Sequence, residues 1–414
     1  MIKNRIVFGN YTDYRFTMTK AQGSYIWDDA GKKLLDFASG WNVTNLGWNN
    51  PEVNEAFIQQ ARKNVYASMW APDKIQEDYA AAILAEYPGV DVAIRTTGGT
   101  EANEVAVKLA RASTGRTKII GFKDTYHGQL FASMALGYIP DYVRAIQPLV
   151  PDFVQMDYPA ATPGDVAKDA QTLADFKTQL ETILAAKDVA AIFVEPGIVT
   201  GWGACKMAPS GFVELVRELT TQYGTLMVVD EVGTGFSRTG TLFGIDRFKV
   251  TPDIATFAKA VTNGAGGLGA VLTRAELVEK TISEANYTST FGWMPTACAA
   301  ALATLAIHKR DKVWENAATL GDKFIETLRT ELSPLGAVVR GMGLEVCVDL
   351  AAVPGVASSI VRNVEQTCKD NGLAIVTGDD GYDLQLMPPC NISAQDLDFG
   401  TSVLVDAIKE ATKN

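Results

Sequence analysis

The chain has 414 residues, of which 47% are hydrophobic, and carries a formal net charge of -11 at pH 7. This length is sufficient for a large core with a subsidiary domain, and the acidity argues against nucleic acid or a membrane surface as the main partner. No apolar run is long enough to span a bilayer, no signal peptide opens the chain, and the five cysteines show no C-x-x-C spacing. These features predict a reduced, cytoplasmic protein.

The first quarter of the chain predicts a hairpin followed by two helices. Gly23 to Asp36 places two apolar runs around a D-D-A-G turn, which indicates two antiparallel strands. A proline near the start and Glu52 in the first turn indicate a helix over Pro51–Tyr66. A second helix is expected over Ile75–Tyr87, ended by Pro88-Gly89.

Strands and helices alternate from about residue 90 to residue 272. This alternation is typical of an α/β fold with a mostly parallel sheet covered by helices. The expected strands are Val90–Ile94, Lys118–Phe122, Val189–Val194, Leu226–Val229, Ile254–Ala258 and Gly266–Leu272, and the expected helices are Glu101–Arg111, Gly211–Tyr223 and, beyond them, Thr296–His308.

The C-terminal third changes to long helices and short strands, which predicts a smaller α+β domain. The expected helices are Lys312–Leu332, Pro354–Asn371 and Ser393–Thr412, and the expected strands are Ala337–Arg340, Leu344–Leu350, Leu373–Val376 and Asp383–Met387.

Two of the buried strands stop on groups that can carry chemistry. The run Leu226–Val229 stops on Asp230, and the run Ile254–Ala258 stops on Lys259. In one sheet the carboxylate and the amine would project near each other, and an amine among apolar residues loses its charge more easily. A neutral amine suits Schiff-base chemistry, and a carboxylate can hold a pyridine nitrogen protonated. A strand end reaching water is the ordinary alternative; a P-loop ATPase is excluded because G-x-x-x-x-G-K-[ST] is absent.

Two other segments could bind a ligand. Thr97 to Glu101 lies between a strand and a helix, where glycines and free N–H groups can form a phosphate cup, although an ordinary turn has the same pattern. Tyr126 and His127 follow a strand at the sheet edge where α/β ligands bind, so an aromatic ring there could stack on a planar cofactor or simply pack.

Two familiar motifs are excluded or reinterpreted. Gly264 to Gly269 matches G-x-G-x-x-G, but a strand rather than a helix is expected after it, so a dinucleotide site is rejected. These glycines either let the backbone pass close to Lys259 or form a plain flexible loop. The two histidines, His127 and His308, are too few for a multi-histidine zinc site, and no metal is expected.

The chain resembles the class III aminotransferases, enzymes of fold type I that use pyridoxal phosphate. The resemblance runs in order from about Gly23 to Pro389, nearly the whole chain. Its segments are the hairpin over Gly23–Asp36, GTEANEVAVKLAR (Gly99–Arg111), TGRTKIIGF and YHG, VVDEVGTGFSRTG (Val228–Gly240), TPDIATFAKA around Lys259, STFGWMPTACAAA (Ser289–Ala301), RGMGL (Arg340–Leu344) and LMPP (Leu386–Pro389).

The resemblance implies a role for each matching position. Lys259 looks like the Schiff-base lysine that also shuttles the proton, and Asp230 would pair with the pyridine nitrogen. Val232 would pack on one face of the ring and Tyr126 on the other, with His127 beside it at the cofactor.

The resemblance also implies a phosphate site and a dimer. Gly99 and Thr100 would hold the phosphate, and Thr290 would reach the phosphate of a neighbouring subunit, so a homodimer with shared active sites is expected. The large domain would span residues 46–305, and residues 1–45 and 306–414 would form a discontinuous small domain.

Some positions depart from the family pattern. Members that act on α-amino acids often carry an Arg three residues before the Pro-Pro pair, where this chain has Gln385. Thr200 stands where acetylornithine-like members have Glu, so an ornithine or acetylornithine donor is not expected. Gly233 replaces a Gln or branched residue, so one contact to the cofactor is absent.

Aromatic residues could complete a substrate pocket. Trp41, Trp202 and Tyr138, together with Gln385, could line an apolar pocket, although large aromatics are also ordinary core residues.

These observations predict an aminotransferase that moves an amino group from a small-molecule amine or ω-amino donor to a keto acid acceptor such as pyruvate through Lys259. Two alternatives stay open. The segments around TGRTKIIGF and Trp41 are also similar to glutamate-1-semialdehyde aminomutases. A non-catalytic protein with the same fold would not need Lys259 and Asp230 together.

Overall fold

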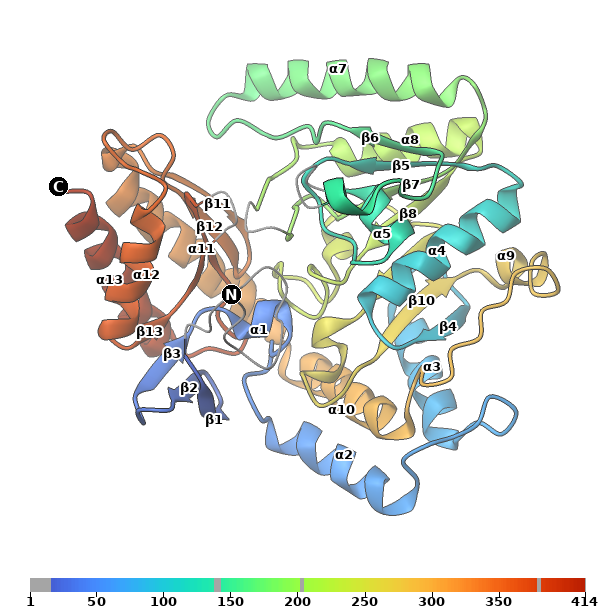
Figure 1. Cartoon of the computed structure of the whole chain (residues 1–414), viewed down its shortest axis with the longest axis horizontal. Coiled ribbons are helices and arrows are strands. Elements are labelled where there is room, and N and C mark those ends of the chain that lie inside the picture. Colours follow the sequence, from blue (N-terminus) through green and yellow to red (C-terminus); the bar gives the residue numbers. More distant parts are fainter. Residues whose placement is uncertain (1–15, 138–142, 202–204, 378–380, 414) are drawn as a thin grey trace.

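The computed structural model of the chain describes residues 16–137, 143–201, 205–377 and 381–413. Helices and strands in these ranges form one large layer around a seven-stranded sheet and a second layer around two four-stranded sheets (Figure 1). None of the described helices combines the length and the apolar character that a membrane span requires.

The seven-stranded sheet carries the expected mostly parallel core. Four neighbouring pairs are parallel, whereas β10 runs antiparallel to both β9 and β4. Every residue of the central strands is buried, which explains why they read as continuous apolar runs. The order across the sheet is β4 (Val92–Thr96), β10 (Gly269–Thr273), β9 (Ile254–Phe257), β8 (Leu226–Asp230), β7 (Val189–Val194), β5 (Lys118–Phe122) and β6 (Phe153–Met156).

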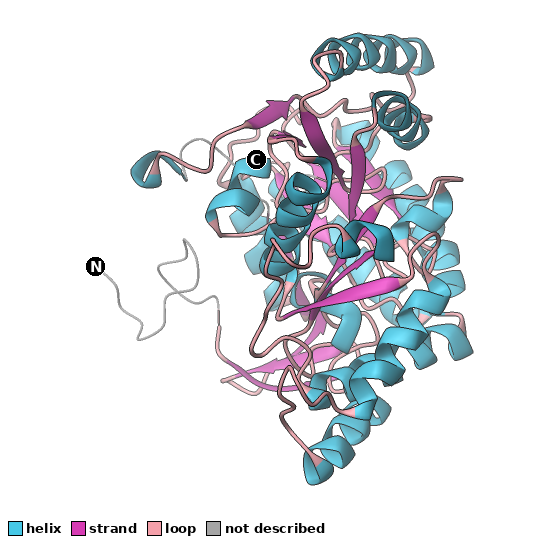
Figure 2. Ribbon diagram, turned by 90° about the vertical axis from the view of Figure 1, so that its right-hand side faces the viewer, coloured by secondary structure: helices cyan, strands magenta, loops and turns pink. Residues whose placement is uncertain are grey.

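Helices cover both faces of this sheet (Figure 2). Neighbouring residues along a strand point to opposite faces, so Val228 packs in the core with α4 and Val229 packs in the core with α3, α7, α8 and α10. The helices of this layer are α2 (Pro51–Lys63), α3 (Lys74–Glu86), α4 (Gly99–Thr114), α5 (Phe131–Leu136), α7 (Val166–Leu184), α8 (Phe212–Tyr223), α9 (Ala275–Glu279) and α10 (Pro295–Asp311), with the short helices η1 (Arg144–Ile146), η2 (Gly244–Arg247) and η3 (Lys259–Thr262).

The second layer joins the two ends of the chain. The N-terminal strand β3 pairs in parallel with β13 from the C-terminal third. One sheet has the order β1 (Met18–Gln22), β2 (Tyr25–Asp28), β3 (Lys33–Asp36) and β13 (Leu373–Ala374). The other sheet has the order β11 (Val338–Met342), β12 (Glu345–Asp349), β15 (Asp383–Leu386) and β14 (Val376–Thr377). The helices of this layer are α1 (Ser39–Asn42), α11 (Val313–Leu332), η4 (Ser333–Leu335), α12 (Ile360–Asp370) and α13 (Ala394–Ala411).

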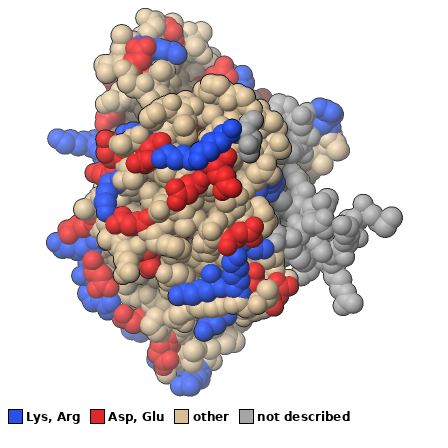
Figure 3. Space-filling view, turned by 90° about the vertical axis from the view of Figure 1, so that its left-hand side faces the viewer, with Lys and Arg blue, Asp and Glu red and all other residues tan. Residues whose placement is uncertain are grey.

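The outer face of the second layer carries acidic and basic side chains side by side (Figure 3). Lys323 of α11 pairs with Asp398 of α13, and Lys409 of α13 pairs with Glu331 of α11. Exposed ion pairs of this kind contribute little to stability. Because both signs of charge occur side by side, the described part of this face has mixed charge.

Most elements predicted from the sequence are confirmed, and the differences have physical causes. The predicted strand Leu373–Val376 is wrong as one element, because β13 and β14 pair in two different sheets. The predicted helix Pro354–Asn371 begins only at Ile360. The strand β6 and the helix α7 were not predicted, although Phe176, Leu180 and Leu184 are the buried residues of α7 and recur every fourth position.

Candidate active site

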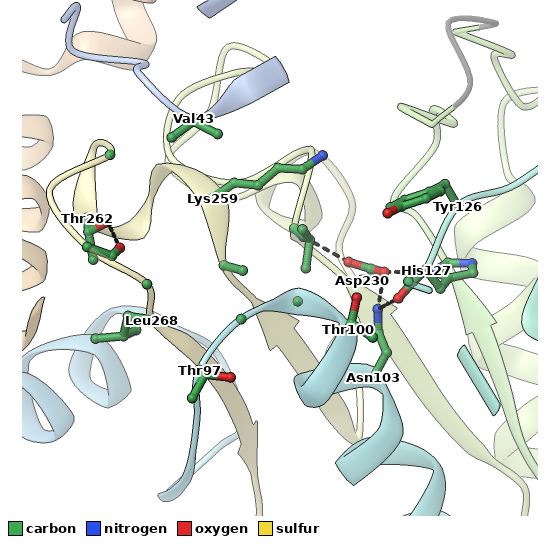
Figure 4. A pocket seen from close by; sticks show the side chains of 18 residues that line it. Val43, Thr97, Thr100, Asn103, Tyr126, His127, Asp230, Lys259, Thr262 and Leu268 are labelled. Atoms are coloured by element: carbon green, nitrogen blue, oxygen red, sulfur yellow. Dashed lines mark hydrogen bonds and ion pairs between the residues drawn. The ribbon is translucent and has the colours of Figure 1, made fainter. Parts of the chain in front are cut away.

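Asp230 and Lys259 meet at one edge of the large sheet. The strands β8 and β9 are parallel neighbours, and Asp230 is the register partner of Thr256, three residues before Lys259. Both residues line a cavity of about 380 Å³ at the carboxyl ends of these strands (Figure 4). The other lining residues are Val43, Thr97, Gly98, Gly99, Thr100, Asn103, Tyr126, His127, Gly128, Val232, Ala258, Thr262, Gly264, Gly266, Gly267 and Leu268.

The backbone at Lys259 is turned in a way that is rare for a lysine. Its φ is +49°, in the left-handed region, where β9 ends and η3 begins. The side chain extends toward the side of the cavity that holds Asp230 and Tyr126 (Figure 4). Burial lowers the pKa of Lys259 from its ordinary value, although the charges of Glu195, Asp230 and Glu345 oppose that shift. The site therefore favours a neutral amine more than water does.

Asp230 is held by donors on both of its oxygens. His127 Nδ1 and Asn103 Nδ2 lie 2.7 and 2.9 Å from Oδ2, and the backbone N–H of Val232 donates to Oδ1 over 2.9 Å. Burial alone would raise the pKa of Asp230, but His127 and the other donors bring it below its ordinary value. Burial would likewise lower the pKa of His127, yet the hydrogen bond and charge of Asp230 raise it. A buried carboxylate thus stays charged.

Asn103 is a site residue that the sequence reasoning missed. Its Nδ2 donates to Asp230 and to the carbonyl of His127, and its Oδ1 accepts from Thr256 Oγ1 over 2.8 Å. The residue lies one turn into α4 after the glycines of the candidate phosphate cup. A polar residue one turn inside such a helix, on the face that meets the sheet, is the signal that could have identified it.

The start of α4 forms an anion site. The helix begins at Gly99 after Gly98, and no side chain caps its first N–H groups. Free N–H groups and the helix dipole attract an anion at this end. A Cβ on Gly99 would lie 3.1 Å from a methyl group of Val232, so the glycine keeps the two close. Thr100 adds a hydroxyl on the same side of the cavity.

The glycine-rich segment after Lys259 closes the cavity from another side. Gly264, Gly266 and Gly267 line it, and a Cβ on Gly269 would lie 2.5 Å from the carbonyl oxygen of Gly98. Close approach of two backbones, rather than flexibility, therefore explains the glycine at position 269.

The structure brings together most of the predicted cofactor residues. Gly99, Thr100, Tyr126, His127, Val232 and the pair of Asp230 and Lys259 all line this cavity. Thr290 is exposed and does not line it.

The predicted substrate residues are placed differently. Trp41 and Gln385 are absent from the described lining of the cavity, and Gln385 is fully buried, donating to Thr200 O and Glu345. Tyr138 and Trp202 lie outside the described residues. Over the described residues, no cluster of three or more potential ligands could hold a metal ion.

The residues of the cavity fit the cofactor that the resemblance implies. The helix start at Gly99 offers N–H groups to a phosphate, the charged carboxylate of Asp230 offers an acceptor to a pyridine N–H, and Lys259 offers an amine to an aldehyde. All three groups face one cavity, which matches the phosphate, the ring nitrogen and the aldehyde of pyridoxal phosphate.

Comparisons with known proteins agree with this fit. The family model "Aminotransferase class-III" matches residues 8–408. The chain is 30% identical over 411 residues to the acetylornithine aminotransferase of Methanothermobacter thermautotrophicus, covering 99% of this chain and 98% of that protein. It is similar to a thermostable (S)-enantioselective omega-transaminase from Thermomicrobium roseum, with a TM-score of 0.88 and 28% identity over 96% of this chain and 92% of that one.

A third relative has its cofactor described. The ornithine aminotransferase of Toxoplasma gondii, with partial occupancy of pyridoxal phosphate at its active site, has a TM-score of 0.86 and 27% identity over 99% of this chain and 94% of that one. Together with the family match, these findings show that the chain belongs to the class III aminotransferases, enzymes of fold type I that use pyridoxal phosphate.

Proposed function

We propose that this aminotransferase takes its amino group from an amine or ω-amino donor whose carboxylate is absent or distant, and passes it to a keto acid such as pyruvate. The observation that carries the proposal is the absence of a carboxylate-binding cation: Lys259 is the one Lys or Arg among the described lining residues. An α-carboxylate next to the reacting carbon would find no bidentate Arg there, because the position that the family often gives to Arg is Gln385.

The neighbouring departures support the same donor class. Thr200 occupies the position of a Glu in acetylornithine-like members, and its hydroxyl and N–H both donate to Glu195. A Cβ on Gly233 would lie 1.9 Å from Thr200 Oγ1, so a Gln at position 233 has no room beside this threonine. This chain therefore departs from the pattern of acetylornithine-like members at positions 200 and 233.

Each residue of the site has a role in the proposed reaction. Pyridoxal phosphate, when bound, supplies the aldehyde that receives the amino group and a ring that withdraws electrons. Asp230 keeps its charge and holds a proton on the ring nitrogen. Lys259 Nζ would carry a proton from the donor carbon to the carbon that receives the amino group in the first half of the cycle, and in the reverse direction to the acceptor carbon in the second half. Gly99 and Thr100 hold the phosphate, while Val232 and Tyr126, with His127 beside it, enclose the ring.

We also propose that the chain divides into a large domain of residues 46–305 and a small domain of residues 1–45 and 306–414. We further propose a homodimer in which Thr290 contacts the phosphate bound by its partner. Support for the dimer comes from exposed aromatic side chains close to Thr290: Phe291 is 61% exposed and its ring contacts Tyr66. Light scattering should give twice the mass of the chain. Thr290→Ala should weaken cofactor binding without changing that mass; a monomeric active enzyme would refute this part.

A donor panel tests the proposed reaction. Simple amines and ω-amino acids should react with pyruvate faster than ornithine or glutamate, and 2-oxoglutarate should be tried as the second acceptor. Lys259→Ala should fold but lose turnover, and borohydride should fix the cofactor on the peptide that contains residue 259. A strong preference for ornithine or glutamate would overturn the donor class, and unchanged turnover of Lys259→Ala would overturn the role of this lysine.

The same panel separates transfer from internal rearrangement. An aminomutase of the glutamate-1-semialdehyde type returns the amino group to the same carbon skeleton. Release of a free carbonyl product from the donor, in amounts equal to the new amino acid, supports transfer.

A further inference from the structure

A buried carboxylate lies between the large layer and the second layer of the molecule. Glu345, at the start of β12, has no exposed surface. Two amides donate to it, Asn42 Nδ2 over 2.7 Å to Oε2 and Gln385 Nε2 over 2.5 Å to Oε1. The thiol of Cys205 is a weaker donor at 3.4 Å from Oε1. We call Glu345, Asn42 and Gln385 the acceptor cluster.

Both amides of the acceptor cluster have a buried oxygen without a partner. Asn42 Oδ1 and Gln385 Oε1 accept no hydrogen bond in the part of the chain that the structure describes. The two N–H groups on the carboxylate set the orientation of these amides, so their oxygens are acceptors only. Buried acceptors are nearly always satisfied, and a pair of them beside a carboxylate indicates a missing donor.

Glu345 also lacks a cation of its own. Burial raises the pKa of Glu345 and the charge of buried Arg238 opposes that rise. The Nη atoms of Arg238 donate to Leu344 O, Pro388 O and Asn45 Oδ1 instead. Among the described residues, no Lys or Arg forms an ion pair with Glu345. Gln385 stands where many family members have Arg, and it donates one N–H without cancelling the negative charge.

The acceptor cluster stands directly behind the wall of the cavity. Asn42 is followed by Val43, a lining residue. Gln385 Nε2 also donates to Thr200 O over 2.9 Å, and Thr200 packs against Gly233, next to the lining residue Val232. The charge of Glu345 is felt at Lys259. These neighbours place the cluster next to the cavity wall, where its charge still acts on Lys259.

We propose that the acceptor cluster binds a second ammonium group at the far end of the donor, so that the preferred donors are linear diamines. A primary ammonium has three N–H donors, and the cluster offers three acceptors for them: the Glu345 carboxylate, Asn42 Oδ1 and Gln385 Oε1. This inference rests on the proposed transaminase function. It adds that the site selects donors with a positive charge at the far end.

Three donors of matched length test the selected charge in the holoenzyme with pyruvate. They are 1,5-diaminopentane, with a cationic far end; hexylamine, with an apolar one; and 5-aminopentanoate, with an anionic one. The wild type should have a KM for diaminopentane about tenfold below that for hexylamine, with a similar kcat, because binding at the far end does not change the reacting carbon. A preference for 5-aminopentanoate would overturn the proposal.

Variants identify the side chain that selects a cationic donor. Glu345→Gln should remove the advantage of diaminopentane over hexylamine, measured as the ratio of their kcat/KM values, so that any change common to both donors cancels. Gln385→Arg should lower diaminopentane reactivity and raise that of 5-aminopentanoate, because the new cation pairs with Glu345 and repels the ammonium. Asp349→Asn, on the same strand but paired with Arg340, is the matched control and should keep the wild-type ratio.

The outcomes separate this inference from the proposed function. If hexylamine is transaminated and Glu345→Gln leaves the ratio of diaminopentane to hexylamine unchanged, the acceptor cluster is structural and the inference fails alone. If no amine donor reacts, the proposed function fails with it. Melting curves establish that each variant is folded, and Gln385→Arg gives the answer by itself should Glu345→Gln not fold.

Discussion

The Nδ1 atom of His127 lies 2.7 Å from Oδ2 of Asp230, and both side chains are almost completely buried. This contact joins the segment after β5 to the end of β8, two strands separated in the sheet by β7. A carboxylate that is charged and shielded from water requires such a partner, because an isolated buried carboxylate would take up a proton. We therefore expect His127 to act on the reaction through Asp230.

Replacement of His127 by Leu should shift the acid side of the pH–rate profile. The pKa of Asp230, held down chiefly by His127 against the effect of burial, should rise. The carboxylate would then be protonated at a higher pH than in the wild type, so the acid limb of the profile should move to higher pH while turnover recovers at alkaline pH. His127→Gln, which retains a donor, should shift the profile less. A loss of equal size at every pH would show that His127 is only structural.

Asn103 and Thr256 should be coupled in stability. Asn103→Ala removes a donor from the buried Asp230 and should cost about 2 kcal/mol in the free energy of unfolding, whereas Thr256→Val should cost about 1 kcal/mol. Because Thr256 acts through Asn103 Oδ1, the double variant should lose less than the sum of the two changes. Urea unfolding of the four proteins measures this coupling, and strict additivity would contradict it.

Position 233 should tolerate a side chain only when the side chain at position 200 is made smaller. Gly233→Ala places a Cβ 1.9 Å from Thr200 Oγ1 and should destabilise the chain by about 1–3 kcal/mol. Adding Thr200→Gly should restore part of this loss, and the double variant should be more stable than additivity predicts. Gly98→Ala is the control, because its Cβ would meet no atom within 4 Å. Equal melting temperatures for Gly233→Ala and the wild type would contradict the clash.

Glu195 should make the enzyme less stable as the pH rises from 4.5 to 7. Burial raises the pKa of Glu195 from 4.5 to about 7, so the folded chain binds a proton in this window that the unfolded chain releases. Stability from this group is present below pH 4.5 and is lost as pH rises through 7, by up to about 3 kcal/mol.

Glu195→Gln removes this dependence and isolates it from other groups. The variant should gain stability relative to the wild type between pH 5 and pH 8 in melting experiments. The exposed Glu326→Gln should show no such pH-dependent gain. A constant difference between Glu195→Gln and the wild type across this range would rule out the proton uptake.

Several residues that line the cavity could be picked out from the sequence because they lie in short segments with a local signature. Asp230 and Lys259 end apolar runs, and Gly99 follows a strand and starts a helix, so the periodicity of the neighbours gives their positions in the elements. Parallel strands in one sheet then bring their carboxyl ends to the same edge. The sequence alone therefore indicated most strands of the large sheet, the residues that end β8 and follow β9, and the family.

Contacts between distant segments were decided only by the tertiary structure. Asn103 reaches Asp230 across 127 positions, and Gln385 reaches Glu345 from another strand, so no local pattern marks either contact. The split of β13 from β14 has the same origin, because each pairs with a different remote strand. Periodicity records which side of an element is buried, whereas the partner on that side depends on how the whole chain packs.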